Sequence, residues 1–225
     1  YTVTLNGEDK ETKYTTENNS YKMSNLSSGT LYTVTVKAYD TSTKTYSDGV
    51  TEKFYSSPEK AAEVKVGNVD SSSATVSWLI PSSSARSELY LINTNASGEI
   101  LKRTLLTDKG TGSYKADSLK GTTKYRFEIL NYCELSGKKY YSEKVLSENF
   151  TTLPGKVENL KALSSGDKVS LSWTLQSGAD GYEVYDSDKN LIKELTSDKS
   201  LCVIYNLQEG NNYTFFVRSF IKDTD

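Results

Sequence analysis

Histidine is absent from the 225 residues, and proline, cysteine and methionine are scarce, at three, two and one residues. The lack of histidine excludes both the commonest general base and the commonest metal ligand. No constellation of serine, cysteine and a general base takes its place, and the glycine-rich turns do not form a phosphate loop. We therefore predict a chain that is not an enzyme, with no catalytic residues, no cofactor and no metal site.

Neither a cluster of basic charge nor a long apolar run occurs in the chain. The 27 basic and 29 acidic residues are spread evenly and give a net charge of -2. Nucleic-acid binding needs a basic stripe, and a bilayer crossing needs about 20 consecutive apolar residues. The sequence therefore predicts neither a nucleic-acid partner nor membrane insertion of this segment.

Tyrosine is abundant, with 17 residues, and aromatic residues reach 11% although the mean hydropathy is -0.57. A disordered chain would be poor in aromatic and β-branched residues, whereas this one is rich in both. Polar composition with many aromatics fits several small modules with modest cores better than one thick core.

One pattern recurs three times along the chain. A Leu is followed six residues later by a Tyr, a Gly turn lies between them, and apolar residues then alternate with polar ones. Alternation with a period of two after a turn is typical of a half-buried strand. The three copies run from Leu26 to Tyr32, from Leu119 to Tyr125, and from Leu207 to Tyr213.

A second pattern occurs twice and contains both tryptophans. Alternating apolar residues end on Trp78 and on Trp173, each about twenty residues after a proline, Pro58 or Pro154. Many short alternating strands, frequent turns and no helical period indicate antiparallel sandwiches.

Together these motifs resemble the fibronectin type III family over nearly the whole chain. The resemblance implies an all-β, immunoglobulin-like antiparallel sandwich with a Trp in strand B and a tyrosine corner between strands E and F. It makes Trp78 and Trp173 the core tryptophans and gives the three repeat tyrosines the corner role, with Leu26, Leu119 and Leu207 beside them in the core. It also implies an extracellular, secreted or cell-surface location.

Pro58 and Pro154 mark the predicted module boundaries. We expect a partial module over 1–57 (strands C to G), a complete module over 58–153, and a module over 154–225 that lacks its last strand. Short linkers predict an elongated, semi-rigid arrangement. In the complete module the last strand is expected over 140–151. We also expect the natural chain to continue beyond both ends.

Few side chains suggest a binding site. Tyr46, Tyr140 and Tyr141 occupy equivalent places where the last strand begins, and exposed tyrosines there could anchor a partner. A structural role is the alternative for all three. Asp186, Asp188 and Asn190 have the first half of a calcium-loop spacing but are interpreted as a polar turn.

The two cysteines fall in different modules, so we expect no disulfide between them. Cys202 is expected to be buried, and Cys133 half-buried.

Spacing is the leading functional hypothesis. The resemblance implies spacer or scaffold modules of a larger protein, whose partners are other domains of the same chain. The composition is similar to repeats in bacterial surface proteins and secreted multimodular enzymes, so a bacterial cell-wall or secreted source is expected. The alternatives are adhesin modules that bind a host protein or a glycan through loops, and a surface filament completed by strand exchange.

Overall fold

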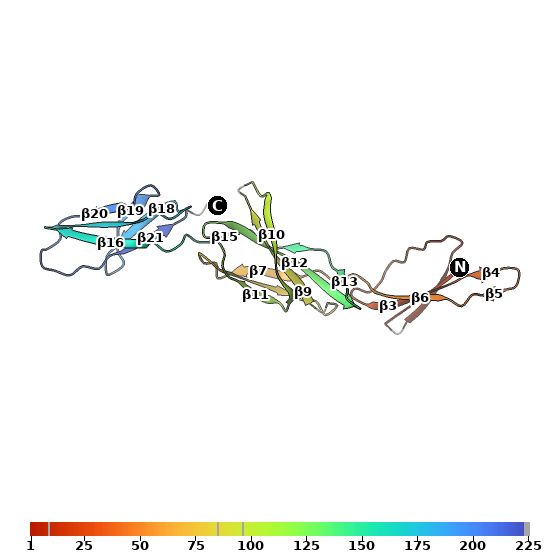
Figure 1. The fold of residues 1–225 in the computed structure, drawn as a ribbon. Coiled ribbons are helices and arrows are strands. Elements are labelled where there is room, and N and C mark those ends of the chain that lie inside the picture. Colours follow the sequence, from red (N-terminus) through yellow and green to blue (C-terminus); the bar gives the residue numbers. More distant parts are fainter. Residues whose placement is uncertain (9, 85, 96, 223–225) are drawn as a thin grey trace.

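The computed structural model describes residues 1–8, 10–84, 86–95 and 97–222, and its regular structure is β throughout. The strands follow one another in three groups along an elongated molecule (Figure 1). The all-β, tandem-sandwich fold class predicted from the sequence is confirmed. The boundaries at 57/58 and 153/154 stay a prediction, and we call the three ranges the first, middle and third modules.

The first module contains one four-stranded antiparallel sheet of order β2-β1-β3-β6 and a small hairpin, β4-β5. Val3 and Leu5 are its most buried apolar residues, each 4% exposed. The strands are β1 (Thr2–Gly7), β2 (Lys10–Thr15), β3 (Leu31–Lys37), β4 (Tyr39–Asp40), β5 (Thr45–Tyr46) and β6 (Val50–Tyr55).

The middle module is a two-sheet sandwich. One sheet has the order β11-β8-β7, and the other has β10-β9-β12-β13, with β14 and β15 also pairing with β12. Its core cluster includes Trp78, Leu89, Phe127 and Ile129. The strands are β7 (Ala62–Gly67), β8 (Ala74–Leu79), β9 (Arg86–Thr94), β10 (Ile100–Gly110), β11 (Ser113–Ala116), β12 (Lys124–Leu135), β13 (Lys138–Tyr141), β14 (Val145–Leu146) and β15 (Phe150–Thr151).

The strand expected over 140–151 is broken into β13, β14 and β15. Ser142 and Ser147 interrupt it, because each hydroxyl accepts a backbone N–H of β12 that a carbonyl would otherwise accept. Ser142 Oγ accepts from Asn131 N at 3.1 Å, and Ser147 Oγ from Phe127 N at 2.8 Å. Side-chain hydroxyls thus replace ladder carbonyls and bend the strand at intervals.

The third module has two three-stranded sheets, of order β16-β17-β20 and β19-β18-β21. A separate core cluster includes Leu171, Trp173, Tyr182 and Val184. The alternating segment that follows Tyr213 forms a strand only from Phe216 onward. The strands are β16 (Glu158–Ser165), β17 (Lys168–Thr174), β18 (Gly181–Tyr185), β19 (Leu191–Thr196), β20 (Leu201–Ile204) and β21 (Phe216–Phe220).

Among the described residues, no helix is long and apolar enough to cross a membrane.

Candidate functional site

The two tryptophans lie in the interiors of their modules. Trp78 on β8 is 5% exposed and Trp173 on β17 is 6% exposed. Trp78 Nε1 donates to Ser87 Oγ at 2.9 Å, and Ser87 Oγ donates in turn to Asn131 Oδ1 at 2.7 Å. Both rings are therefore positioned as structural anchors and are not available to a ligand.

All three repeat tyrosines accept a hydrogen bond from the backbone N–H five residues upstream. Ser27 N donates to Tyr32 Oη at 2.9 Å, Lys120 N to Tyr125 Oη at 3.2 Å, and Gln208 N to Tyr213 Oη at 3.0 Å. This is the geometry of a tyrosine corner.

Burial of the corner residues differs between the modules. Tyr32 and Tyr125 are 7% and 6% exposed, whereas Tyr213 is 45% exposed and is not a core residue in this structure. Rings from later strands lie beside the two buried tyrosines: Phe54 stacks against Tyr32, and Phe150 lies tilted against Tyr125. The leucines follow the same trend in part: Leu119 is buried, and Leu26 and Leu207 are half-buried.

The three candidate binding tyrosines do not come together. Tyr46 is 56% exposed on the β4-β5 hairpin, where its ring lies 4.8 Å from that of Tyr39. Tyr140 is half-buried at the junction with the first module, 6.1 Å from the ring of Tyr55. Tyr141 belongs to a polar network on the middle module. Tyr46 is thus the most exposed of the three and lies on strand β5 of the hairpin.

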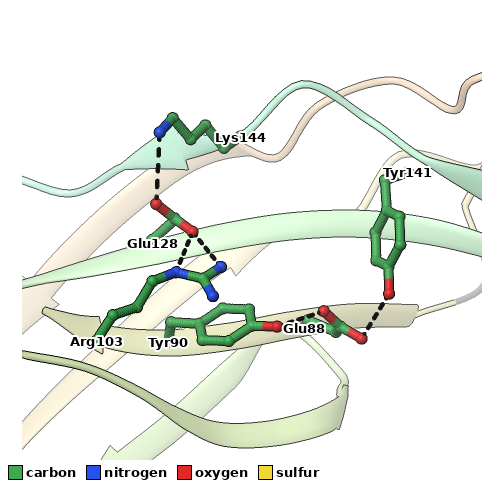
Figure 2. A network of polar contacts seen from close by, with 6 residues as sticks. All are labelled: Glu88, Tyr90, Arg103, Glu128, Tyr141 and Lys144. Atoms are coloured by element: carbon green, nitrogen blue, oxygen red, sulfur yellow. Dashed lines mark hydrogen bonds and ion pairs between the residues drawn. The ribbon is translucent and has the colours of Figure 1, made fainter.

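The polar network lies on the outer face of the β10-β9-β12-β13 sheet, and its first centre is Glu88 (Figure 2). The Glu88 carboxylate accepts from Tyr90 Oη at 2.8 Å, Tyr141 Oη at 2.9 Å and Lys139 Nζ at 2.9 Å. Alternation along β9 directs Leu89 into the core and its two neighbours outward. Glu88 is only 8% exposed, so the three donors compensate a nearly buried charge.

A second centre, Glu128 on β12, lies beside the first (Figure 2). Arg103 donates to Glu128 Oε1 from Nε at 2.9 Å and from Nη2 at 2.5 Å, and Lys144 Nζ lies 3.8 Å from Oε2. The Arg103 guanidinium also lies over the Tyr90 ring, 3.3 Å from its centroid. This stacking joins the two centres.

The pKa values within the network follow from these contacts. Burial alone would raise the pKa of Glu88, but the hydrogen bonds from Lys139, Tyr90 and Tyr141 outweigh it and lower the pKa. Burial and then the hydrogen bond to Glu88 raise the pKa of Tyr141 to about 12. The hydrogen bond to Glu88 raises the pKa of Lys139. Each group is thus held in its ordinary charge state near neutral pH, which suits a structural tie between strands.

The third module repeats the motif in a smaller form. Tyr185 Oη donates to Glu183 Oε2 at 2.8 Å, and Arg218 forms a hydrogen-bonded ion pair with the same oxygen. The Glu-x-Tyr sequence of Glu88 and Tyr90 recurs here, so the signal was present in the sequence. It was missed because its cationic partners come from different strands, Lys139 on β13 and Arg218 on β21.

The predicted polar turn at Asp186 is a turn in which the carboxylate caps its own loop. Asp186 Oδ1 accepts from Asp188 N at 2.9 Å and Asn190 N at 2.8 Å, and Oδ2 accepts from Asn190 Nδ2 at 3.0 Å. These oxygens already have donors, which is the geometry of an Asx turn.

Both cysteines lie in the interior. Cys202 on β20 is 2% exposed, and burial raises the pKa of its thiol. Cys133 is 5% exposed, more buried than expected, and its Sγ lies 3.2 Å from the carbonyl oxygen of Ser83. The environment of Cys202 therefore disfavours a thiolate.

Comparison with known proteins agrees with this picture. No protein-family model matches the chain. The chain is 25% identical, over 207 residues and 90% of its length, to the receptor-type tyrosine-protein phosphatase eta of Gallus gallus, and it spans 14% of the length of that protein.

Two solved structures are similar at lower identity. A two-domain fibronectin type III segment of chicken tenascin matches 71% of this chain and 90% of its own, with 17% identity and a TM-score of 0.47. The FN1-FN3 domains of chicken CNTN1 match 98% of this chain and 85% of their own, with 14% identity and a TM-score of 0.33. The resemblance to tandem fibronectin type III modules is confirmed and rests here on the sheets and tyrosine corners of the chain itself. The Gallus gallus relative gives no support to a bacterial source.

Proposed function

We propose that these tandem fibronectin type III-like modules form a non-catalytic spacer in a larger extracellular, secreted or cell-surface protein. In this role the segment holds other domains of the same chain apart. The observation that carries the proposal is the end-to-end arrangement of the strand groups in an elongated molecule (Figure 1). The match to only 14% of a much longer receptor-type protein supports a place within a multidomain chain.

The described polar clusters support a structural role. The carboxylates of Glu88 and Glu183 are engaged by cations and tyrosines of the same sheet. A catalytic acid or base needs a pKa near the working pH, whereas the hydrogen bonds to Glu88 and Glu183 lower the pKa of both carboxylates.

Solution scattering tests the proposed extension. Three modules of about 30 Å in line give a rod of about 90 Å, with a radius of gyration of about 26 Å. A compact chain of the same length would give about 17 Å. A radius near the compact value in dilute solution would overturn the spacer. Growth of the apparent mass with concentration would instead support a strand-exchanged filament.

A second candidate function is adhesion through the β4-β5 hairpin of the first module. The observation that favours it is the pair Tyr39 and Tyr46, which are 42% and 56% exposed and lie ring against ring. Exposed aromatic pairs serve as anchors for protein or glycan partners.

Glycan-array and matrix-protein binding by the full chain would test the adhesive role. We expect the wild type to show no saturable binding if spacing is its function. Saturable binding that Tyr46→Ser abolishes, and that Tyr213→Ser leaves intact, would favour adhesion. Tyr213 is a suitable control because it is also exposed but lies in another module.

A further inference from the structure

The two module junctions bring together the same two loops. One is the corner loop that precedes a corner tyrosine (residues 26–32 and 119–125), and the other is the tryptophan turn of the next module (residues 81–84 and 176–179). Gly29 of the first corner loop lies against Ser83, and Thr122 of the second lies against Gly178. Gly29 and Thr122 are each three residues before the corner tyrosine. Ser83 and Gly178 are each five residues after the core tryptophan.

The tryptophan turns have the same backbone hydrogen bond. Ser84 N donates to Pro81 O at 3.0 Å, and Ala179 N donates to Gln176 O at 3.3 Å. Both are i to i+3 turns that begin three residues after the tryptophan. Gly178, at φ +82°, occupies the third position of its turn, where a type II turn requires a positive φ.

Each junction places one glycine against the neighbouring module, Gly29 against the backbone of Ser83 and Gly178 against the side chain of Thr122. A Cβ added to Gly29 would lie 2.7 Å from the carbonyl carbon of Ser83, and one added to Gly178 would lie 2.6 Å from Cβ of Thr122. Such distances are well inside van der Waals contact, so the modules would have to separate. The glycine is on the corner loop in the first junction and on the tryptophan turn in the second.

A hydroxyl two residues before each linker proline fastens the linker to the corner loop. Ser56 Oγ donates to Ser27 O at 2.5 Å and accepts from Thr30 N at 2.9 Å. Thr152 Oγ1 donates to Lys120 O at 2.6 Å and, in the same way, accepts a backbone N–H of its corner loop. Both loops are thus held by equivalent pairs of bonds.

The residue after each linker proline is held by the following module. Asn131 Nδ2 donates to Glu59 O at 2.9 Å, and Ser219 Oγ donates to Gly155 O at 2.8 Å. In the second junction Thr122 Oγ1 also donates to Ser177 O of the tryptophan turn, at 3.0 Å. The linker is therefore tied at both ends.

We infer that these contacts form one repeated docking interface, in which the corner loop of a module receives the tryptophan turn of the next and fixes the angle between them. The chain then rotates in solution as a single rod and not as three independent modules. This inference rests on the proposed spacer function. It makes the spacer stiff, because fixed angles between the modules keep the length of the molecule constant under thermal motion.

Amide nitrogen relaxation in the full chain tests the interface, because modules that are rigidly joined tumble together and share one rotational diffusion tensor. The relaxation rates of all three wild-type modules are expected to fit this common tensor. Gly29→Ala should uncouple the first module alone, and Gly178→Ala the third alone. Gly210→Ala is the matched control, since Gly210 has a φ of +82° and nothing within 4 Å of an added Cβ.

A second substitution separates docking from backbone strain. In Gly178→Ala the obstacle is the side chain of Thr122, so Thr122→Gly added to it should restore common rotation of the third module. The strain of alanine at positive φ remains in the double variant. Thr122 itself has a φ of 50°, so glycine there relieves strain of its own, and the readout is therefore rotation and not stability. Should Gly29→Ala fail to fold, Ser56→Ala removes only the hydroxyl of the first junction and is expected to uncouple the first module.

Three results would overturn the interface: independent rotation of the wild-type modules, common rotation retained in the variants of Gly29, Gly178 and Ser56, or no rescue by Thr122→Gly. The scattering experiment keeps the two proposals apart. A long molecule with independently rotating modules retains the spacer and removes the joint, whereas a compact molecule removes the spacer.

Discussion

The middle and third modules share a core tryptophan and differ in how its N–H is satisfied. In the middle module Trp78 Nε1 donates to Ser87 Oγ, in a chain that ends on Asn131. In the third module Trp173 Nε1 is buried and has no hydrogen-bond partner among the described residues. Tyr182 stands there in place of the serine and packs its ring 5.4 Å from that of Trp173. The same motif therefore supports a polar core in one module and an aromatic core in the other.

The corner tyrosines show the same divergence on the surface. Tyr125 is 6% exposed and has Phe150 of β15 beside it, whereas Tyr213 is 45% exposed. Among the described residues, β21 pairs only with β18, so no strand lies along its other edge. The local hydrogen bond of a corner forms in both cases. Burial depends on whether a further strand packs over it.

Removal of either tryptophan should have the largest effect. Trp78→Ala and Trp173→Ala are each expected to destabilise their own module by about 3–5 kcal/mol. Each variant keeps one tryptophan, whose fluorescence during urea unfolding reports the other module. If either variant lowered the urea midpoint of both modules, the two modules would share one core.

The charged network should contribute less, and in a pH-dependent way. Glu88→Gln is expected to lower the free energy of unfolding by about 1–3 kcal/mol at pH 7, because three donors lose a charged acceptor. The pKa of Glu88 is lowered on folding from its ordinary 4.5, so its stabilisation is fully present above about pH 4.5. It is lost as the pH falls through the lowered folded value.

Urea titrations of the wild type and of Glu88→Gln at pH 7 and pH 3 check this sign. The difference in the free energy of unfolding between the wild type and Glu88→Gln should be smaller at pH 3 than at pH 7. Glu183→Gln in the third module should show the same sign with a smaller size, because its partner Arg218 is 65% exposed and solvent screens the pair. An equal or larger effect for Glu183→Gln would contradict the ranking.

Replacement of tryptophan by phenylalanine sharpens the comparison of the two cores. Both changes remove similar volume, but Trp78→Phe also leaves Ser87 without its donor. We expect Trp78→Phe to cost about 1–2 kcal/mol more than Trp173→Phe. The free energies come from urea unfolding followed by far-ultraviolet circular dichroism. Equal costs would mean that the Trp78 hydrogen bond contributes nothing net.

The corner hydroxyls should give the smallest effects. Tyr125→Phe is expected to cost about 1 kcal/mol, since Lys120 N loses its acceptor in a part-buried site. Tyr213→Phe should cost below about 0.5 kcal/mol, because water can replace the hydroxyl at that exposed corner. Thermal unfolding of both variants measures the difference. A larger loss for Tyr213→Phe would show that exposure does not decide the strength of the corner.

Local patterns were sufficient to predict strands and corners. Alternation placed β8 and β17 correctly because each needs one face of apolar side chains, and the six-residue spacing from Leu to Tyr is set by the turn itself. The break in the strand at Ser142 and Ser147 was not predicted, since it depends on which hydroxyls meet the backbone of β12. Tyr140 and Tyr141 are adjacent in sequence, but Tyr140 lies at a module junction and Tyr141 donates to the Glu88 carboxylate. Their positions in the sequence could not distinguish these two environments.

The sequence by itself determined that this chain folds as β-sandwich units with tryptophan anchors and tyrosine corners, because period and turn chemistry act within a few residues. Tertiary structure alone decided that Tyr213 is exposed, that Glu88 and Glu128 tie four strands together, and that Gly29 and Gly178 lie where modules meet. Those outcomes depend on groups that are distant in sequence and close in space. Their contact energies exist only once the sheets have packed.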